Sequence, residues 1–395
     1  MDLRIDPAKW RRRRGMARLL EALDADEGAT RYVGGAVRDD LLDLPVSDVD
    51  LATRLQPEEV IERLDKVRIK AVPTGIDHGT ITAVSDGHAY EVTTLRRDVS
   101  TDGRRATVAF TTAWEEDAAR RDFTINALSA DPRTGEIFDY FGGLDDLRER
   151  HVRFIGDPLK RIAEDHLRIL RYFRFHARFG SGEPDRSALE ACTRRANDLM
   201  ALSRERIADE LLKLLNIADP SATVAIMLGR GILAPVLPEI AAERVTDLKA
   251  LVGAEQAAAI APSGLRRLSA LLPRDSAVAA DVAARIKLSN KARKRLACAA
   301  GAGVDSPEAL AYRVGTDCAV DRLLLAGKAE VAARIRAWAV PRLPIGGGAL
   351  IARGLAEGPI VARTLRKIED RWIDAGFPEG DSLEAIVAEA LASDS

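Results

Sequence analysis

The stretch from residue 32 to residue 53 constrains this chain most, because it joins a glycine turn, an arginine and two neighbouring aspartates. Gly34 and Gly35 allow the backbone to approach a ligand closely and to point N–H groups at an anion. Asp48 and Asp50 would project from one face of a strand, because side chains alternate along a strand. Paired carboxylates repel each other but seat divalent cations well, Mg²⁺ above all. The stretch therefore predicts a site that handles a nucleoside triphosphate.

Composition describes a globular chain of more than one domain. The chain has 395 residues, of which 47% are hydrophobic and 30% charged, so we expect two to four folding units. No run of about eighteen apolar residues is present and the first residues lack the apolar core of a signal peptide. These features predict a cytoplasmic protein without membrane association.

Charge and cysteine content exclude further classes. A net charge of −2 argues against a protein that coats nucleic acid, although local basic patches remain compatible with it. Cys192, Cys298 and Cys318 lie far apart in the sequence and form no paired motif. We therefore expect neither a zinc site nor a disulfide framework.

The pattern along the chain predicts an α+β protein. Residues 1–150 show short strand-like runs with turn signals between them, at 31–33, 47–51, 80–84 and 88–94. Asp86-Gly87 between the last two runs predicts a tight hairpin turn. From about residue 157 onward the apolar residues recur with helical spacing to the end of the chain. A small mixed sheet with helices should therefore precede a long all-helical region.

The first motif carries a family resemblance. Gly-Gly-x-Val-Arg-Asp-x-Leu-Leu followed by Asp-x-Asp resembles the signature of the nucleotidyltransferase superfamily, in the branch of bacterial tRNA CCA-adding enzymes and poly(A) polymerases. The resemblance implies a catalytic head at 1–150, a base-reading neck at 151–218, and a body and a tail that bind tRNA at 219–330 and 331–395. These last three parts would form an elongated all-α region.

The resemblance also implies roles for the first motif. Asp48 and Asp50 would be the catalytic residues that hold Mg²⁺, while Gly34, Gly35 and Arg38 would hold the nucleotide phosphates. Glu91 precedes a charged segment on a predicted strand and is a candidate third carboxylate near the metal.

A second motif spans residues 120–128, where an arginine pair precedes an aspartate. We assign Arg121 to the phosphates, because a guanidinium binds them bidentately, and Asp122 to the ribose hydroxyls. The alternative is a charged helix start whose arginine and aspartate pair only locally. Between the two motifs, residues 96–106 predict a charged loop; in the family the matching loop is mobile and helps to switch between nucleotides.

A third motif, Glu164-Asp-His-Leu-Arg168, resembles the family segment that replaces a nucleic-acid template. We expect it to open a helix that continues through Arg171 and Arg174, with Asp165 and Arg168 as surface neighbours three residues apart. A carboxylate acceptor beside a guanidinium donor matches the Watson–Crick edges of cytosine and adenine, and mismatches guanine and uracil. Arg171 and Arg174 would reach the triphosphate. The alternative is a solvated arginine-rich face held by a Glu164–Arg168 pair.

Three further segments are interpreted more plainly. Residues 203–213 predict a helix that braces the base-reading segment, with Ser203 and Arg206 in its N-terminal cap region and Ile207 and Leu211 in the core. Residues 10–14 and 287–295 are basic runs that would grip RNA or simply face solvent. The candidate RNA-binding residues of the second run are Lys287, Lys291, Arg293, Lys294 and Arg295.

The resemblance therefore implies an enzyme that adds or repairs the 3′-terminal CCA of tRNA from CTP and ATP, with Mg²⁺ as cofactor and no stable protein partner. A poly(A) polymerase, or an enzyme that adds only the C or only the A residues, remains open. An RNA-binding protein that has lost catalysis and a transferase acting on small molecules are the alternatives from other classes.

Overall fold

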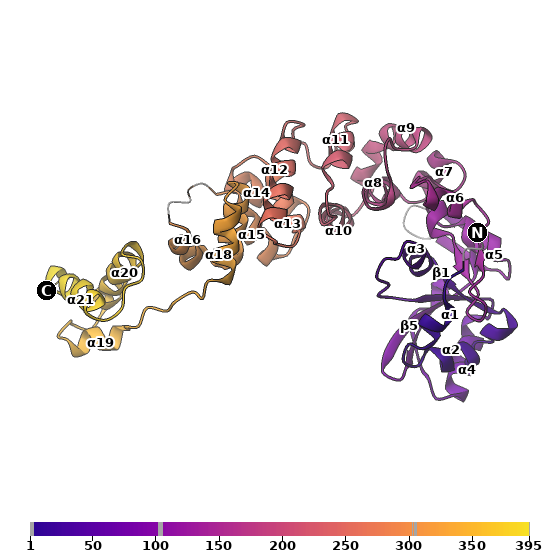
Figure 1. The fold of residues 1–395 in the computed structure, drawn as a ribbon, viewed down its shortest axis with the longest axis horizontal. Helices are drawn as coiled ribbons and strands as arrows, with labels where there is room; N and C mark the ends of the chain where they lie inside the picture. The colour runs from indigo at the N-terminus through magenta and orange to yellow at the C-terminus, as the bar shows by residue number, and fades with distance from the viewer. Residues whose placement is uncertain (1–3, 102–105, 302, 304–305, 395) are drawn as a thin grey trace. The chain divides into compact units, whose positions relative to one another are not determined.

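The structure, a computed structural model, describes residues 4–101, 106–301, 303 and 306–394. The chain forms two compact units (Figure 1). Unit 1 comprises Met1–Leu214 and Ile226–Val236, and unit 2 comprises Leu215–Ala225 and Leu237–Ser395. The strands lie in unit 1 and the described part of unit 2 is helical, which confirms the predicted fold class. The finer predicted division at residues 150, 218 and 330 stays a prediction.

A seven-stranded mixed sheet in unit 1 carries the site, with the strand order β3-β4-β5-β2-β1-β8-β9. β2 and β5 run parallel and the other neighbours run antiparallel. A separate two-stranded sheet pairs β6 with β7. The strands are β1 Thr30–Val33, β2 Asp50–Thr53, β3 Lys70–Gly75, β4 Thr80–Ser85, β5 His88–Thr94, β6 Arg96–Thr101, β7 Ala106–Phe110, β8 Ser129–Ala130 and β9 Ile137–Phe138.

Most of the predicted strands are confirmed, but one begins later than expected. The runs at 31–33, 80–84 and 88–94 fall within β1, β4 and β5, and Asp86 and Gly87 both have the positive φ of a tight hairpin turn. The run at 47–51 is wrong, because β2 pairs with β1 only from Asp50 onward, where Asp50 lies opposite Val33. Asp48 therefore precedes the strand, and strand alternation does not fix its direction.

The expected loop at 96–106 is also wrong in part. β6 pairs with β7 as an antiparallel ribbon in which Arg96 lies opposite Phe110. The middle of the expected loop, residues 102–105, lies outside the described residues. We expected a loop here because charged residues and turn formers are typical of loops. They also obscure the alternating pattern of the strands on either side.

The early helices of unit 1 lie beside the sheet, and the later ones continue the chain away from it (Figure 1). Phe123 packs against Phe154 and Phe175 with ring centroids 5.0 and 5.1 Å apart. These contacts fasten α8 to the segment that carries Arg121 and Asp122. The helices are α1 Pro7–Arg11, α2 Met16–Ala22, α3 Gly35–Leu41, α4 Pro57–Lys66, α5 Trp114–Ala119, α6 Gly143–Arg148, α7 Pro158–Glu164, α8 Arg168–Phe179, α9 Arg186–Arg194 and α10 Arg204–Leu215, and α11 Ser221–Gly229 belongs partly to each unit.

Unit 2 is built around a buried network of charges. Arg266 bridges Glu255 and Asp321, and Arg267 donates from Nε to Glu255 over 2.8 Å. Arg267 also donates to the backbone carbonyls of residues 215, 217 and 218. The helices are α12 Arg244–Ala257, α13 Gly264–Leu271, α14 Ser276–Arg285, α15 Asn290–Ala299, α16 Pro307–Val314, α17 Thr316–Leu325, α18 Ala329–Ala337, α19 Gly347–Ala352, α20 Pro359–Asp374 and α21 Asp381–Asp394.

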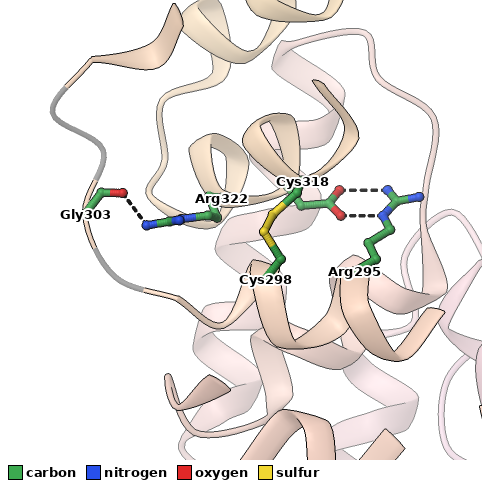
Figure 2. The surroundings of a disulfide bond; sticks show 6 residues. Arg295, Cys298, Gly303, Cys318 and Arg322 are labelled. Carbon is green, nitrogen blue, oxygen red and sulfur yellow. Dashed lines mark hydrogen bonds and ion pairs between the residues drawn. A yellow bond between two sulfur atoms is a disulfide. The ribbon is translucent and has the colours of Figure 1, made fainter. Parts of the chain in front are cut away.

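A disulfide joins two helices of unit 2, contrary to the prediction from the sequence. Cys298 of α15 and Cys318 of α17 are bonded, with their Cα atoms 6.2 Å apart (Figure 2). One turn away, Arg295 binds Asp321 through two hydrogen bonds of 2.6 and 2.9 Å. The packing of α15 against α17 brings these cysteines together, and sequence spacing carries no signal of that packing. Cys192 is buried and free.

Among the described residues, no helix combines the length and the apolar content needed to cross a lipid bilayer.

Candidate active site

Two hollows in unit 1 contain almost all of the residues predicted from the first three motifs. The first, which we call the arginine hollow, has a volume of about 510 Å³. The second, which we call the carboxylate hollow, has a volume of about 710 Å³ and contains Asp48, Asp50 and Glu91. Both volumes lie in the range of about 300–1,000 Å³ that is usual for ligand sites. The predicted residues on the arginine hollow are Gly34, Gly35, Arg38, Arg121, Asp122, Asp165, Arg168 and Arg171.

The glycine turn forms one wall of the arginine hollow. Gly34 precedes α3 with a φ of +70°, and a Cβ atom there would lie 2.8 Å from Nη1 of Arg121. Both the backbone conformation and the close arginine therefore require glycine at this position. Arg38, one turn into α3, is buried, stacks over Phe179 and binds Asp39 and Asn126. The turn thus places backbone N–H groups and a fixed guanidinium beside each other.

Asp122 lines this hollow, is buried and accepts several hydrogen bonds. It accepts hydrogen bonds from the backbone N–H of Phe123, from Asn126 and from Nε of Arg171, at 2.9, 2.9 and 2.8 Å. Burial alone would raise the pKa of Asp122, but the charge of Arg171 and these hydrogen bonds hold that pKa below its usual value. Asp122 is therefore an anion that orients Arg171, and its predicted contact with ribose stays a prediction.

Arg121 does not pair with its neighbour Asp122. Its Nη2 lies 3.4 Å from Asp117 on α5, and its Nη1 donates to the carbonyl of Asn126 over 3.4 Å. The alternative of a purely local Arg121–Asp122 pair is not what the geometry gives. Both contacts of Arg121 are long, so its guanidinium is held loosely beside Gly34.

The base-reading segment is not the continuous helix that we expected. α7 ends at Glu164, Asp165 is extended with a φ of −151°, and α8 begins at Arg168. The break has a local cause, because the Asp165 carboxylate accepts the backbone N–H of Leu167 over 3.1 Å and so favours a new helix start. Asp165 and Arg168 still line the same hollow, but through a break between helices rather than through helical spacing.

Arg168 is fixed by several acceptors. It pairs with Glu164, as the solvated-face alternative supposed, but it also donates to the backbone carbonyls of Arg120 and Arg161 over 3.1 Å each. Only 12% of its side chain is exposed. A solvated face is therefore not what this arginine forms.

The sequence interpretation missed two residues of α10 that hold the segment in place. Arg206, predicted only as part of a cap region, donates to Oδ2 of Asp165 over 2.8 Å. Glu210 is buried, accepts Nε of Arg174 over 2.7 Å and lies 3.9 Å from Arg171. The available signal was a glutamate on the apolar face of a helix, between Ile207 and Leu211. Arg174 does not line the arginine hollow.

Asp48, Asp50 and Glu91 lie on the wall of the carboxylate hollow. Leu51 of β2 pairs with Val92 of β5, so the preceding residues Asp50 and Glu91 are neighbours on adjacent strands. Shielding from water raises the pKa of Asp50, the negative charges of Glu91 and Asp48 raise it further, and Arg121 opposes the shift. Three carboxylates and two arginines line this hollow, so its formal charge is negative.

This charge imbalance decides whether a metal fits. In the described part of the chain, no group of three or more His, Cys, Asp or Glu side chains is arranged closely enough to hold a metal by itself. Asp48 and Asp50 supply carboxylate oxygens, which hard cations prefer, and Glu91 lies beside Asp50 on the neighbouring strand. The pair fits an open site that a substrate completes, rather than a closed cage.

The predicted RNA-binding residues lie in unit 2. Lys287, Lys291, Arg293 and Lys294 are exposed on or just before α15. Arg295 differs from them, because two of its nitrogens bind Asp321 in the buried network. RNA contact by this run stays a prediction.

The fold and these two hollows define a nucleotidyltransferase head. Residues 30–153 match the family model described as "Poly A polymerase head domain". Residues 183–244 match the model described as "Probable RNA and SrmB- binding site of polymerase A".

Comparison with known proteins shows which kind of nucleotidyltransferase this chain resembles. The chain is 33% identical over 387 residues to "CCA tRNA nucleotidyltransferase 1, mitochondrial" of Mus musculus, covering 92% of this chain and 87% of the relative. It is 44% identical over 199 residues to "CCA-adding enzyme" of Streptococcus gordonii, about half of each chain. The structure of the Bacillus stearothermophilus CCA-adding enzyme in complex with CTP superposes with a TM-score of 0.75 at 25% identity, over 98% of this chain and 99% of that one. This chain belongs to the family of CCA-adding tRNA nucleotidyltransferases.

Proposed function

We propose that this chain adds or repairs the 3′-terminal CCA of tRNA, one nucleotide at a time, from CTP and ATP. The observation that carries the proposal is that a glycine turn, an arginine wall and the Asp165–Arg168 segment share one hollow, while the carboxylates line a second. The names of the mouse and streptococcal relatives and the CTP complex of the Bacillus enzyme support it.

The glycine turn and the arginines bind the triphosphate. Gly34 and Gly35 offer backbone N–H groups, and Arg38, Arg121 and Arg171 supply positive charge around them. The RNA 3′-hydroxyl attacks the α-phosphorus of the nucleotide, and the bond to pyrophosphate breaks. Catalysis then consists mainly of positioning and charge neutralisation.

Asp48 and Asp50 are the residues that would hold divalent ions, and Glu91 is close enough to assist Asp50. Members of this family generally use divalent metals; we infer Mg²⁺, because the donors are carboxylate oxygens. When bound, the ion supplies charge that favours ionisation of the hydroxyl and neutralises the phosphates.

Asp165 and Arg168 select the base. One carboxylate oxygen of Asp165 accepts a hydrogen bond from Arg206, which orients the carboxylate as an acceptor for the amino group of cytosine or adenine. Arg168 donates to the unprotonated ring nitrogen beside it. Guanine and uracil would face each of these groups with the wrong polarity, which leaves unpaired polar groups at about 1–3 kcal/mol each.

Helical unit 2 binds the tRNA. Lys287, Lys291, Arg293 and Lys294 form an exposed basic run that would contact the phosphate backbone. We place the enzyme in the cytoplasm, where tRNA matures, and propose that it acts without a stable protein partner.

The test is incorporation of labelled CTP, ATP, GTP and UTP, each alone and combined, into tRNA trimmed by one, two or three 3′ nucleotides, with Mg²⁺. Ordered addition of C, C and A that then stops is the expected result. Open-ended addition of A to any RNA would instead make the chain a poly(A) polymerase. Addition that stops after the two C residues, or that requires them, would make it a partial enzyme. No incorporation at all would favour an RNA-binding protein.

A further inference from the structure

A basic turn lies against the carboxylate hollow and has no role in the reaction so far. Residues 12–15 connect α1 to α2, and Arg13 and Arg14 line the hollow together with Asp48 and Glu91. The sequence interpretation left this run open between RNA contact and a solvated surface. In the structure, the contacts of Arg13 differ from those of Arg14.

The backbone of this turn is docked firmly on the β4–β5 hairpin. The hydroxyl of Tyr90 donates to the carbonyl of Arg14 over 2.7 Å, and that of Ser85 donates to the carbonyl of Gly15 over 2.8 Å. Gly15 has a φ of +76°, and a Cβ atom there would lie 2.6 Å from the carbonyl oxygen of Ser85. The hairpin that carries Glu91 therefore also fixes the position of Arg14.

The two arginines of the turn differ in what they bind. Arg13 donates from Nη1 to the carbonyl of Ser47 over 2.7 Å and from Nη2 to that of Val46, so it supports the segment that leads to Asp48. Arg14 is exposed. Its guanidinium forms no hydrogen bond or ion pair with any residue that the structure describes. It is a positive charge held at a ligand cavity without a partner of its own.

The ligand of this hollow follows from the topology. Val33 at the end of β1 pairs with Asp50 at the start of β2. The glycine turn that follows β1 and the carboxylates at the start of β2 therefore lie at the same end of the sheet. The residues proposed for the nucleotide line the arginine hollow. In-line attack requires the hydroxyl to approach from the side opposite the departing pyrophosphate, which leaves the carboxylate hollow for the other reactant.

We propose that Arg14 binds the phosphodiester group on the 5′ side of the 3′-terminal nucleotide of the acceptor RNA, as that nucleotide presents its hydroxyl to Asp48 and Asp50 in the carboxylate hollow. This inference rests on the proposed function, since it assigns the second substrate of the same reaction. The contact fixes the terminal hydroxyl beside Asp48 and Asp50. It acts on the RNA and not on the incoming nucleotide, so the two substrates should respond differently to its loss.

The experiment uses full-length enzyme with tRNA that ends in the first C of the CCA sequence. A matched tRNA carries an uncharged methylphosphonate in place of its last phosphodiester. For Arg14→Ala we expect the KM for the ordinary tRNA to rise about tenfold, the loss of one charge-assisted contact. Arg14→Lys should recover most of this loss. The dissociation constant for CTP, measured by equilibrium dialysis without RNA, should not change.

Two comparisons make the test specific. Arg12→Ala removes an adjacent exposed arginine that does not line the hollow, and it should leave the KM for tRNA unchanged. On the methylphosphonate tRNA, wild type should already show the raised KM, and Arg14→Ala should add nothing further. Independent, additive losses from the two changes would overturn the proposal, as would weaker CTP binding by Arg14→Ala.

Failure of the proposed CCA addition would give a different result from failure of the Arg14 contact. If wild-type enzyme extends any RNA with A, or extends none, the proposed function fails. A gel-shift titration with the two tRNAs in the absence of nucleotide still decides the Arg14 contact. Equal affinity of wild type and Arg14→Ala for the ordinary tRNA would refute that contact even in an active CCA-adding enzyme.

Discussion

Arginine–carboxylate pairs occur in both units of the molecule, but they leave different groups accessible. In unit 2, Arg266, Arg267, Glu255 and Asp321 have side chains that are at most 4% exposed. In unit 1, the carboxylate of Asp122 is 9% exposed, whereas its partner Arg171 is 31% exposed. A buried carboxylate that holds a partly exposed arginine leaves guanidinium donors free for a ligand. A pair that is buried on both sides can only support the fold.

The largest effect should come from the part of unit 1 that supports no packing at all. Asp48 is exposed and its carboxylate accepts only the hydroxyl of Ser47 among the described residues. Asp48→Ala should lower CMP incorporation at least about a thousandfold, equivalent to ~4 kcal/mol in the barrier. Its free energy of unfolding, measured by urea titration, should change by less than about 0.5 kcal/mol. Asp65→Ala, an exposed acid of α4, is the control; unchanged incorporation by Asp48→Ala would sink the metal-site assignment.

The reverse pattern should appear in unit 2. Arg267→Ala removes a side chain that is 1% exposed and deprives Glu255 and several backbone carbonyls of a donor. It should destabilise the protein by about 3 kcal/mol, the usual cost of breaking a buried ion pair. Urea unfolding of the full chain measures this.

Arg285→Ala is the matched control for that variant. Its pair with Glu239 is 40% and 23% exposed, so the change should cost less than about 1 kcal/mol. Equal stability of the two variants would show that burial does not separate the two kinds of pair.

The disulfide adds a covalent link to unit 2. Cys318→Ser should reduce the free energy of unfolding by about 2 kcal/mol, because a bond that closes a loop of this size restricts the unfolded chain. Wild type treated with a reducing agent should lose a similar amount, whereas Cys318→Ser should not respond to reduction. A wild-type protein whose unfolding is insensitive to reduction would argue that the two thiols do not bond.

The smallest effect should come from a residue that acts only by orienting another residue of the site. Arg206 holds one oxygen of Asp165, so Arg206→Ala should let the carboxylate turn away from the base. We expect the ratio of UMP to CMP incorporation to rise about tenfold, or ~1.4 kcal/mol. Lys213→Ala, on the same helix and exposed, should leave this ratio as it is. A wild-type ratio in Arg206→Ala would assign Arg206 to the fold alone.

The features that the sequence predicted correctly depend on short spacings. The glycine turn and the hairpin at Asp86 are each specified within a few residues, because local backbone conformation determines them. The placement of Asp48 and Asp50 on one strand was wrong for Asp48. Even here the beginning of β2 was misplaced, since the position of its first residue depends on pairing with β1.

The features that were missed depend on long-range packing. Arg206 reaches Asp165 across 41 residues, and Cys298 reaches Cys318 from another helix. The helix break at Asp165 was missed for a related reason. Its residue spacing suits a continuous helix. The break is favoured locally by the hydrogen bond from the Leu167 N–H to the Asp165 carboxylate, and at long range by the bond from Arg168 to the carbonyl of Arg120.

The position of helix α11 at the boundary between the units affects the design of chimaeric enzymes. Residues up to Ala225 belong to unit 2 and residues from Ile226 to Val236 belong to unit 1, so the boundary falls inside the helix Ser221–Gly229. The chain passes between the units three times, after residues 214, 225 and 236. A chimaera joined at any single point between 215 and 236 would combine fragments from two parents within one unit. A clean exchange of whole units between relatives therefore needs three junctions, after residues 214, 225 and 236.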